Sequence, residues 1–117
     1  MITIEQLKEI QQRADKLKQY LAIDEKRVQL EEEELRTQDP GFWEDAKAAE
    51  AQMRKVKGIK AWIEGYEGVR AATEELQLAF DYCKEELVTE DEVDAAYAHA
   101  IKEVEALEMK NMLSHEE

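Results

Sequence analysis

The sequence predicts an all-α protein, an elongated antiparallel three- or four-helix bundle with coiled-coil character. Only four glycines and one proline occur among the 117 residues, so few positions can interrupt long helices. Charged residues make up 38% of the chain and aromatic residues 7%, which is typical of helical bundles rather than of compact enzymes. Apolar residues recur at steps of three and four, which places them on one helix face.

The length fits a single helical domain. We expect its helices at about 4–22, 24–37, 44–86 and 90–113, with a turn at 38–43. Thr3 and Gln6 have the spacing of a capping box, in which each side chain binds a free backbone N–H of the other residue. The first helix should therefore begin there. Its apolar series is Ile4, Leu7, Ile10, Ala14, Leu17 and Leu21.

The apolar spacing slips between Leu21 and Val28, where a second helix should begin. A bend at 22–24 would explain the slip, and Asp24 is the residue that we expect to cap the next segment. Val28, Leu30 and Leu35 should form its apolar face. We interpret the four acids at 31–34 as a solvated surface.

Asp39, Pro40 and Gly41 form the strongest break in the chain, because proline cannot continue a helix and also disfavours helical geometry in the residue before it. Phe42 and Trp43 follow directly. Two large apolar side chains on a turn either plug the end of a helical core or anchor a partner, and we favour the plug.

The third helix should be the longest, with Asp45 as its cap. Its apolar residues keep a spacing of three and four for about forty residues, or roughly 60 Å, as in a coiled coil. Gly58, Gly65 and Gly68 interrupt the pattern and mark either close helix contacts or a kink. The apolar series consists of Ala46, Ala49, Met53, Val56, Ile59, Ile63, Tyr66, Val69, Leu76, Phe80, Cys83 and Leu87.

A second capping box, Thr89 with Glu92, predicts a tight reversal at 86–90 before the last helix. Two long amphipathic helices joined by so few residues must run antiparallel to bury their apolar faces. The face of the last helix consists of Val93, Tyr97, Ala100, Val104 and Leu107, with Ala96, Ile101 and Met112 beside it.

The net charge of −13 is concentrated near one end of the sequence. Residues 71–117 hold three basic and 14 acidic side chains, so −11 of the total lies there. Such a chain is repelled by phosphate backbones, and we expect little direct binding to nucleic acid. A contact with a nucleoprotein should use a basic protein component or the locally positive stretch. That stretch consists of Arg54, Lys55, Lys57 and Lys60.

Six acids cluster around the predicted reversal and are our candidate docking surface for a basic partner. Acids that begin the last helix also favour the positive end of its dipole, so a structural role explains part of the cluster. The six residues are Glu85, Glu86, Glu90, Asp91, Glu92 and Asp94.

No residue pattern indicates catalysis or a cofactor. His99 and Glu103 stand one helical turn apart, but two ligands do not make a zinc site. A lone cysteine, Cys83, excludes an internal disulfide and suits a reducing compartment. No apolar run approaches the roughly 18 residues of a membrane span, and the N-terminus lacks the regions of a signal peptide. We therefore expect no catalytic, cofactor or metal site and a cytoplasmic location.

Several stretches together resemble the N-terminal domain of the bacterial peptide chain release factor 2 family. They are residues 13–21, Asp24, residues 30–32, the DPGFW turn at 39–43, and residues 106–116. The most specific part is the turn, in which Asp39, Pro40, Phe42 and Trp43 look like the family's structural turn. His115 departs from the family, which has glycine there.

The resemblance implies more than composition can show. Factors of this family recognise UGA and UAA stop codons and promote peptidyl-tRNA hydrolysis on the ribosome. Their codon-reading Ser-Pro-Phe and their Gly-Gly-Gln loop lie in later domains, and this chain contains neither motif. The resemblance thus implies a docking domain whose partners are the stalk-base region of the ribosome and the recycling GTPase release factor.

One other function fits the same residues. A free-standing coiled-coil adaptor or chaperone-like protein would use the same apolar face without a ribosome. A small helical enzyme would need a site that the sequence does not show.

Overall fold

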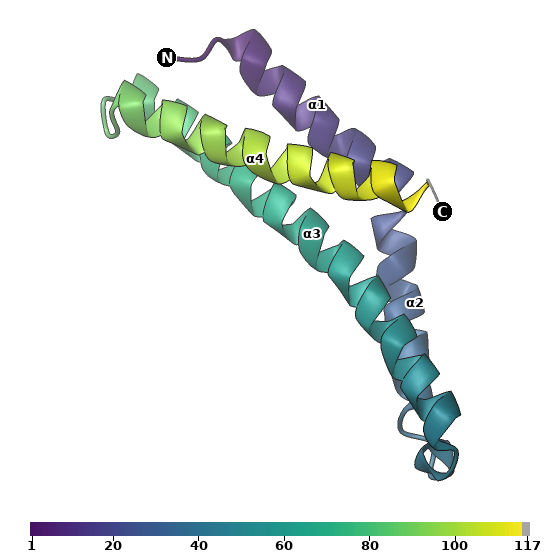
Figure 1. Ribbon diagram of the computed structural model, residues 1–117. Helices are drawn as coiled ribbons and strands as arrows, with labels where there is room; N and C mark the ends of the chain where they lie inside the picture. Colours follow the sequence, from purple (N-terminus) through teal and green to yellow (C-terminus); the bar gives the residue numbers. More distant parts are fainter. Residues whose placement is uncertain (116–117) are drawn as a thin grey trace. The chain divides into compact units, whose positions relative to one another are not determined.

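The structure is a computed structural model that describes residues 1–115, and its regular elements are helices (Figure 1). They are α1 (Ile4–Tyr20), α2 (Ile23–Arg36), the 3-10 helix η1 (Phe42–Glu44), α3 (Ala46–Lys84) and α4 (Glu90–Ser114). The predicted all-α fold is confirmed. The α-helix boundaries differ from the predicted ranges by at most two residues.

The chain divides into two compact units. Unit 1 comprises Met1–Tyr20 and the described residues from Gly65 on, so it contains α1, the second part of α3, and α4. Unit 2 comprises Leu21–Glu64, which hold α2, η1 and the first part of α3. Unit 2 is thus inserted into the sequence of unit 1.

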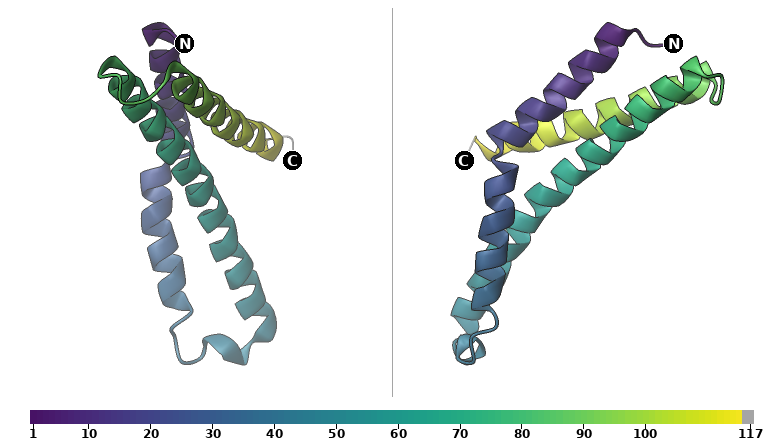
Figure 2. Two further views of the ribbon diagram at one scale, coloured as in Figure 1. Left: turned by 90° about the vertical axis from the view of Figure 1, so that its left-hand side faces the viewer. Right: turned by 180° about the vertical axis from the view of Figure 1, so that it is seen from behind.

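Unit 1 is a three-helix arrangement of mixed direction (Figure 2). The Cβ of an alanine at Gly65 would lie 3.0 Å from Leu107 Cδ1, which reports the close antiparallel approach of α3 and α4. By contrast, α1 runs parallel to α4, because Met1 pairs with Asp94 and Arg13 with Glu108. The bundle therefore combines one antiparallel hairpin with one parallel helix.

The core of unit 1 follows the predicted apolar faces. Those of α1 and α4 are largely confirmed, because four of the α1 positions and four of the α4 positions are buried, although Ile4 is exposed. The buried face of α4 carries both alanines and larger aliphatic residues. The buried residues of α1 and α4 are Leu7, Ile10, Ala14, Leu17, Val93, Ala96, Ala100, Val104 and Leu107, and α3 adds Tyr66, Val69, Ala72, Leu76 and Phe80.

Both predicted capping boxes are present. The Gln6 N–H donates to Thr3 Oγ1 at 3.2 Å and the Thr3 N–H to Gln6 Oε1 at 2.8 Å, which begins α1. At α4, the Glu92 N–H donates to Thr89 Oγ1 at 3.2 Å and the Thr89 N–H to Glu92 Oε2 at 3.0 Å. Two donors that the helix itself cannot satisfy are thus bound at each start.

Unit 2 is an antiparallel hairpin of α2 and the first part of α3 (Figure 2). The predicted cap of α3 is confirmed, since the Ala48 N–H donates to Asp45 Oδ1 at 3.1 Å. The predicted cap of α2 is wrong. Ala22, with φ 50°, precedes the helix, and Asp24 lies within its first turn. The left-handed backbone at Ala22 ends α1 and starts α2 without a capping side chain.

The apolar face predicted for α2 is also wrong in part. Val28 and Leu35 are 56% and 59% exposed, whereas Glu33 is buried. The reason is a set of polar partners for Glu33 on α3, which is described below. Helix α2 therefore turns Glu33 toward α3 and turns Val28 and Leu35 toward solvent.

Two glycines of α3 should respond differently to substitution by alanine. A Cβ at Gly58 would have no neighbour within 4 Å, so Gly58→Ala should stabilise the protein by about 1 kcal/mol through helix propensity. At Gly65 the new methyl would press on Leu107, which is buried and cannot easily move, so Gly65→Ala should lose that gain. Thermal unfolding of the two variants measures the contrast, and equal gains would contradict it.

Candidate functional site

The six predicted docking acids lie at the reversal between α3 and α4 in unit 1. The turn is closed by backbone hydrogen bonds, from the Glu86 N–H to the Cys83 carbonyl at 3.0 Å and from the Leu87 N–H to the Tyr82 carbonyl at 3.0 Å. Glu86 has a left-handed backbone with φ 60°. Five of the six acids are exposed, and Asp94 is partly exposed.

Two of these six acids already have structural partners. Glu92 completes the capping box of α4, and Asp94 accepts from the N-terminal amine at 3.0 Å and from the Ile2 N–H at 3.1 Å. The hydrogen bond with Asp94 raises the pKa of the N-terminal amine above its ordinary value. The others have no ion pair or side-chain hydrogen bond to a described residue. The acids that remain available to a partner are Glu85, Glu86, Glu90 and Asp91.

The turn before η1 matches the prediction in its backbone but not in its aromatic residues. Asp39 accepts from the Phe42 N–H through its carbonyl at 2.9 Å and from the Gly41 N–H through its carboxylate at 3.2 Å. Phe42 is half-buried and meets Trp43 edge to face, with ring centroids 4.6 Å apart. Trp43 itself is 65% exposed, so it does not plug the core of unit 2.

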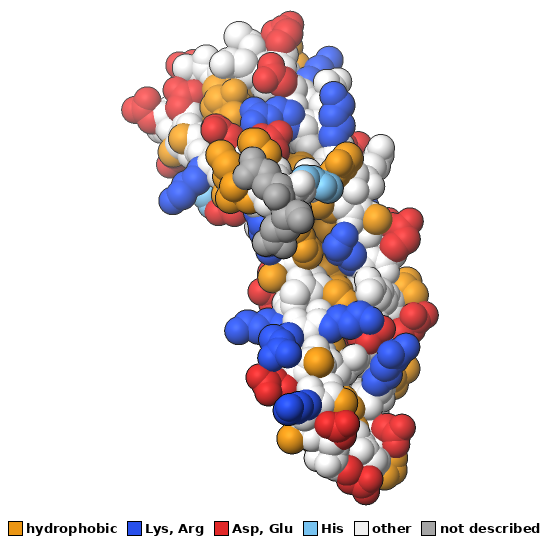
Figure 3. Space-filling view, turned by 45° about the vertical axis from the view of Figure 1, so that its right-hand side comes forward, with side chains coloured by type: hydrophobic (Ala, Val, Ile, Leu, Met, Phe, Trp, Pro, Cys, Tyr) orange, Lys and Arg blue, Asp and Glu red, His pale blue; other side chains and the backbone are white. Residues whose placement is uncertain are grey.

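The basic stretch of α3 is largely neutralised within unit 2. Lys55 lies 3.3 Å from the Glu33 carboxylate and Lys60 lies 3.6 Å from that of Glu34. Arg54 pairs with Glu50 at 2.8 Å. Side chains of both signs are interspersed over the face of unit 2 in the lower part of Figure 3. A stretch that is already paired offers little free positive charge to phosphates.

Glu33 is the best-connected acid of unit 2 and is 5% exposed. Gln52 Nε2 donates to its carboxylate at 2.7 Å and to its carbonyl at 2.9 Å. The hydrogen bonds from Gln52 and Lys55, with the charge of Arg36, hold the pKa of Glu33 below its ordinary value, although burial opposes them. These contacts explain why α2 turns Glu33 toward α3.

Low pH should destabilise unit 2 through Glu33. The contribution of the Glu33 carboxylate to the free energy of unfolding is fully present above its unfolded pKa of about 4.3. It is lost as the pH falls through the lower pKa of the folded state. Glu33→Gln should therefore destabilise unit 2 at neutral pH and flatten its loss of stability in acid. Urea unfolding followed by tryptophan fluorescence measures this, because Trp43 and Trp62 both lie in unit 2. Glu32→Gln, an exposed neighbour, is the control, and the same pH profile for both variants would contradict the prediction.

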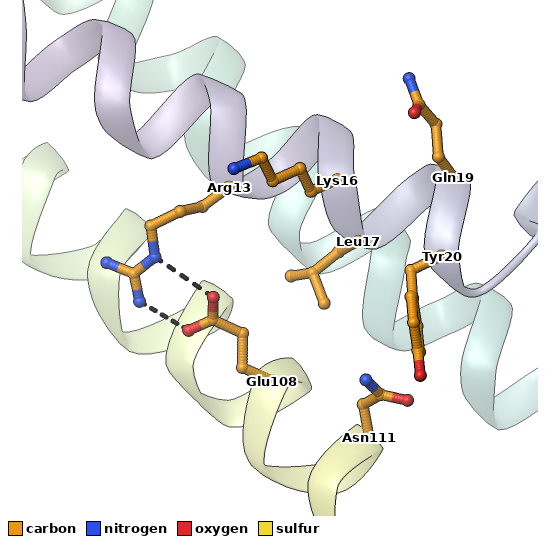
Figure 4. Close-up of a pocket in the computed structure, with 7 residues that line it drawn as sticks. All are labelled: Arg13, Lys16, Leu17, Gln19, Tyr20, Glu108 and Asn111. Carbon is orange, nitrogen blue, oxygen red and sulfur yellow. Dashed lines mark hydrogen bonds and ion pairs between the residues drawn. The ribbon is translucent and has the colours of Figure 1, made fainter.

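A groove of about 580 Å³ lies between α1 and α4 (Figure 4). Arg13 binds Glu108 with both arms of its guanidinium, Nη2 to Oε1 at 2.5 Å and Nε to Oε2 at 3.2 Å, as the dashed lines show. The bond to Glu108 raises the pKa of Arg13. Because the carboxylate is engaged, it is not an available general base. The lining residues are Arg13, Lys16, Leu17, Gln19, Tyr20, Glu108 and Asn111.

Metal-ligating side chains do not gather in the described part of the chain. No group of three or more His, Cys, Asp or Glu residues among 1–115 is placed to hold an ion. His99 Nε2 lies 3.4 Å from Glu103 Oε1, and both residues are accessible on α4. Within residues 1–115, no helix is both long enough and apolar enough to traverse a bilayer.

The sequence analysis missed the pair Arg13–Glu108 and the contacts of Glu33. The first joins residues 95 positions apart, and no local pattern can reveal it. The second left a weak signal, because Gln52 and Lys55 are polar residues at the inner edge of the predicted α3 face. A comparison of the polar positions on the two helices of the predicted hairpin would have revealed the contacts of Glu33.

Comparison with known proteins relates nearly the whole chain to one group. The peptide chain release factor 2 of Pseudoalteromonas translucida is 30% identical over 115 residues, and that of Acidithiobacillus ferrooxidans is 33% identical over 110 residues. The same factor of Burkholderia pseudomallei is 30% identical over 113 residues. These alignments cover 95%, 91% and 93% of this chain.

The chain spans only about 30% of the length of each of these relatives. No protein-family model matches it, and no solved structure matches it. The resemblance inferred from the residues is nevertheless confirmed by the alignments. Over nearly its whole length, the chain is similar to a segment of bacterial peptide chain release factor 2.

Proposed function

We propose that this chain is the N-terminal docking module of a translation termination factor of the release factor 2 type. The similarity to those factors over 91–95% of the chain is the observation that supports the proposal. In full length, such a factor would recognise UGA and UAA codons and promote peptidyl-tRNA hydrolysis in the cytoplasm. The module itself would be non-catalytic, because the codon-reading and Gly-Gly-Gln motifs are absent from it.

The docking partner would be a basic protein at the stalk base of the ribosome, with the recycling GTPase release factor as a second partner. Four exposed acids at the reversal, Glu85, Glu86, Glu90 and Asp91, support a contact through charge. Complementary charge chiefly accelerates association and selects the partner. With a net charge of −13, the module would bind little nucleic acid directly.

Co-sedimentation with bacterial ribosomes tests the proposal. A tip variant, Glu85→Lys, Glu90→Lys and Asp91→Lys, reverses exposed acids and leaves the Glu92 capping box intact. Its control, Glu9→Lys, Asp15→Lys and Glu75→Lys, makes the same charge change at exposed positions of unit 1 outside the reversal. We expect the native chain and the control to sediment with ribosomes and the tip variant to remain in solution.

Two other results would contradict the proposal. Equal loss of binding by both variants would show that only total charge matters, and docking through the acidic tip would be wrong. No binding by the native chain would contradict a docking module that acts by itself and would favour the coiled-coil adaptor.

A further inference from the structure

The outer face of α2 has a composition that the hairpin of unit 2 does not explain. Val28 and Leu35 are 56% and 59% exposed, whereas Ile23 and Glu33 of the same helix are buried. With 3.6 residues per turn, positions seven apart lie on one face, so the two aliphatic side chains form one stripe. That stripe points away from the buried side of the helix.

Acids border this stripe on both sides. Asp24 precedes Val28 by four residues, and Glu31 and Glu32 lie three or four residues from both aliphatic side chains. Side chains at these spacings are neighbours on a helix surface. The outer face of α2, as used below, therefore consists of Asp24, Val28, Glu31, Glu32 and Leu35.

The acids of the outer face differ from the two that follow them in the chain. Glu33 and Glu34 each lie beside a lysine of α3, whereas Glu31 and Glu32 are exposed and have no ion pair or side-chain hydrogen bond to a described residue. Asp24 likewise has none. Their charge is thus not consumed within unit 2, and it surrounds two aliphatic side chains whose burial would be favourable.

We propose that the outer face of α2 is a docking site for a basic amphipathic helix of another protein. Aliphatic anchors at i and i+7 fit the apolar stripe of such a helix, and the bordering acids complement its basic flanks. A second copy of this chain is a poor occupant, because a two-fold contact would place this face against itself and bring its acids together. The site lies in unit 2, so it goes beyond docking through the tip of unit 1 and holds whether or not that docking occurs.

A designed peptide tests the site directly. It would have about 18 residues, or five helical turns, with leucine along one face and lysine beside it. Fluorescence anisotropy of the labelled peptide with the 117-residue chain, at an ionic strength of about 0.15 M, gives the dissociation constant. A peptide of the same composition in scrambled order controls for charge alone.

Two pairs of variants locate the contact. Val28→Ser with Leu35→Ser removes the stripe, and Leu78→Ser with Leu113→Ser removes two equally exposed leucines of unit 1. Glu31→Gln with Glu32→Gln and Asp15→Asn with Glu75→Gln make the same change of net charge on the two units, and Asp15 and Glu75 lie outside the candidate docking surface at the reversal. We expect each unit 2 variant to weaken binding about tenfold or more and each unit 1 variant less than about twofold.

Three results of the binding measurements would overturn the proposal. They are no binding of the native chain at peptide concentrations up to about 1 mM, equal weakening by the variants of the two units, or equal affinity for the scrambled peptide. Self-association of the native chain that Val28→Ser with Leu35→Ser abolishes would also overturn it, because a second copy would then be the occupant. Circular dichroism confirms that the exposed substitutions leave the helices intact.

Discussion

Leu76→Ala should reduce the free energy of unfolding of unit 1 by about 2–5 kcal/mol. Leu76 is fully buried, with 0% exposure, at the centre of the second part of α3. Its truncation removes apolar contacts and leaves a cavity that rigid helices cannot fill by collapsing. Since small domains are stable by only about 5–15 kcal/mol, the loss is a large part of the total.

The matched control for this prediction is Leu78→Ala. Leu78 lies two residues away on the same helix but is 53% exposed, so its truncation should cost less than about 0.5 kcal/mol. Urea unfolding followed by circular dichroism measures both variants. Tryptophan fluorescence reports unit 2 separately, because both tryptophans are in that unit. Similar losses for the two variants would contradict the description of the core.

Ala100→Leu should destabilise unit 1 by about 1–3 kcal/mol, for the opposite reason. Ala100 is completely buried in α4, which approaches α3 closely at Gly65 and again at Gly68. Because Ala100 is 0% exposed, a larger side chain there must displace its neighbours. The midpoint of thermal unfolding should fall by roughly 4–20 °C.

Ala98→Leu is the control for overpacking, because Ala98 is exposed two residues earlier on α4. Leucine and alanine have similar helix propensities, so this change should leave the midpoint almost unaltered. Thermal unfolding by circular dichroism compares the two variants. An unchanged midpoint for Ala100→Leu would mean that the space beside α4 is larger than the structure shows.

The fold of unit 1 was predictable from the sequence to the extent that its helices are amphipathic. In α1, Leu7, Ile10, Ala14 and Leu17 supply one unambiguous apolar face, and the hydrophobic effect buries it whatever the neighbour. The parallel course of α1 along α4 was not predictable, because it depends on contacts such as Arg13–Glu108 between distant residues. Periodicity gives the face of a helix but not its direction.

Helix α2 shows where periodicity fails. A helix in a two-helix hairpin buries only a narrow stripe, and α2 offers competing stripes through Leu30 and Glu33 on one side and Val28 and Leu35 on the other. The polar partners of Glu33, which come from α3, favour the first. The candidate docking acids at the tip were predictable as a cluster. Their division into bound and available carboxylates was not, since it depends on the N-terminus and the cap.

The insertion of unit 2 into unit 1 has a consequence for synthesis of the chain. Residues 21–64 contain both segments of their hairpin, so every contact within this unit becomes possible once residue 64 has left the ribosome. Helix α1 must wait for α4, whose Glu108 is made 95 residues after its partner Arg13. At about 5–20 residues per second, that delay is roughly 5–20 seconds. During this interval the apolar face of α1 is exposed, and early contacts with chaperones are expected at the beginning of the chain rather than at its middle.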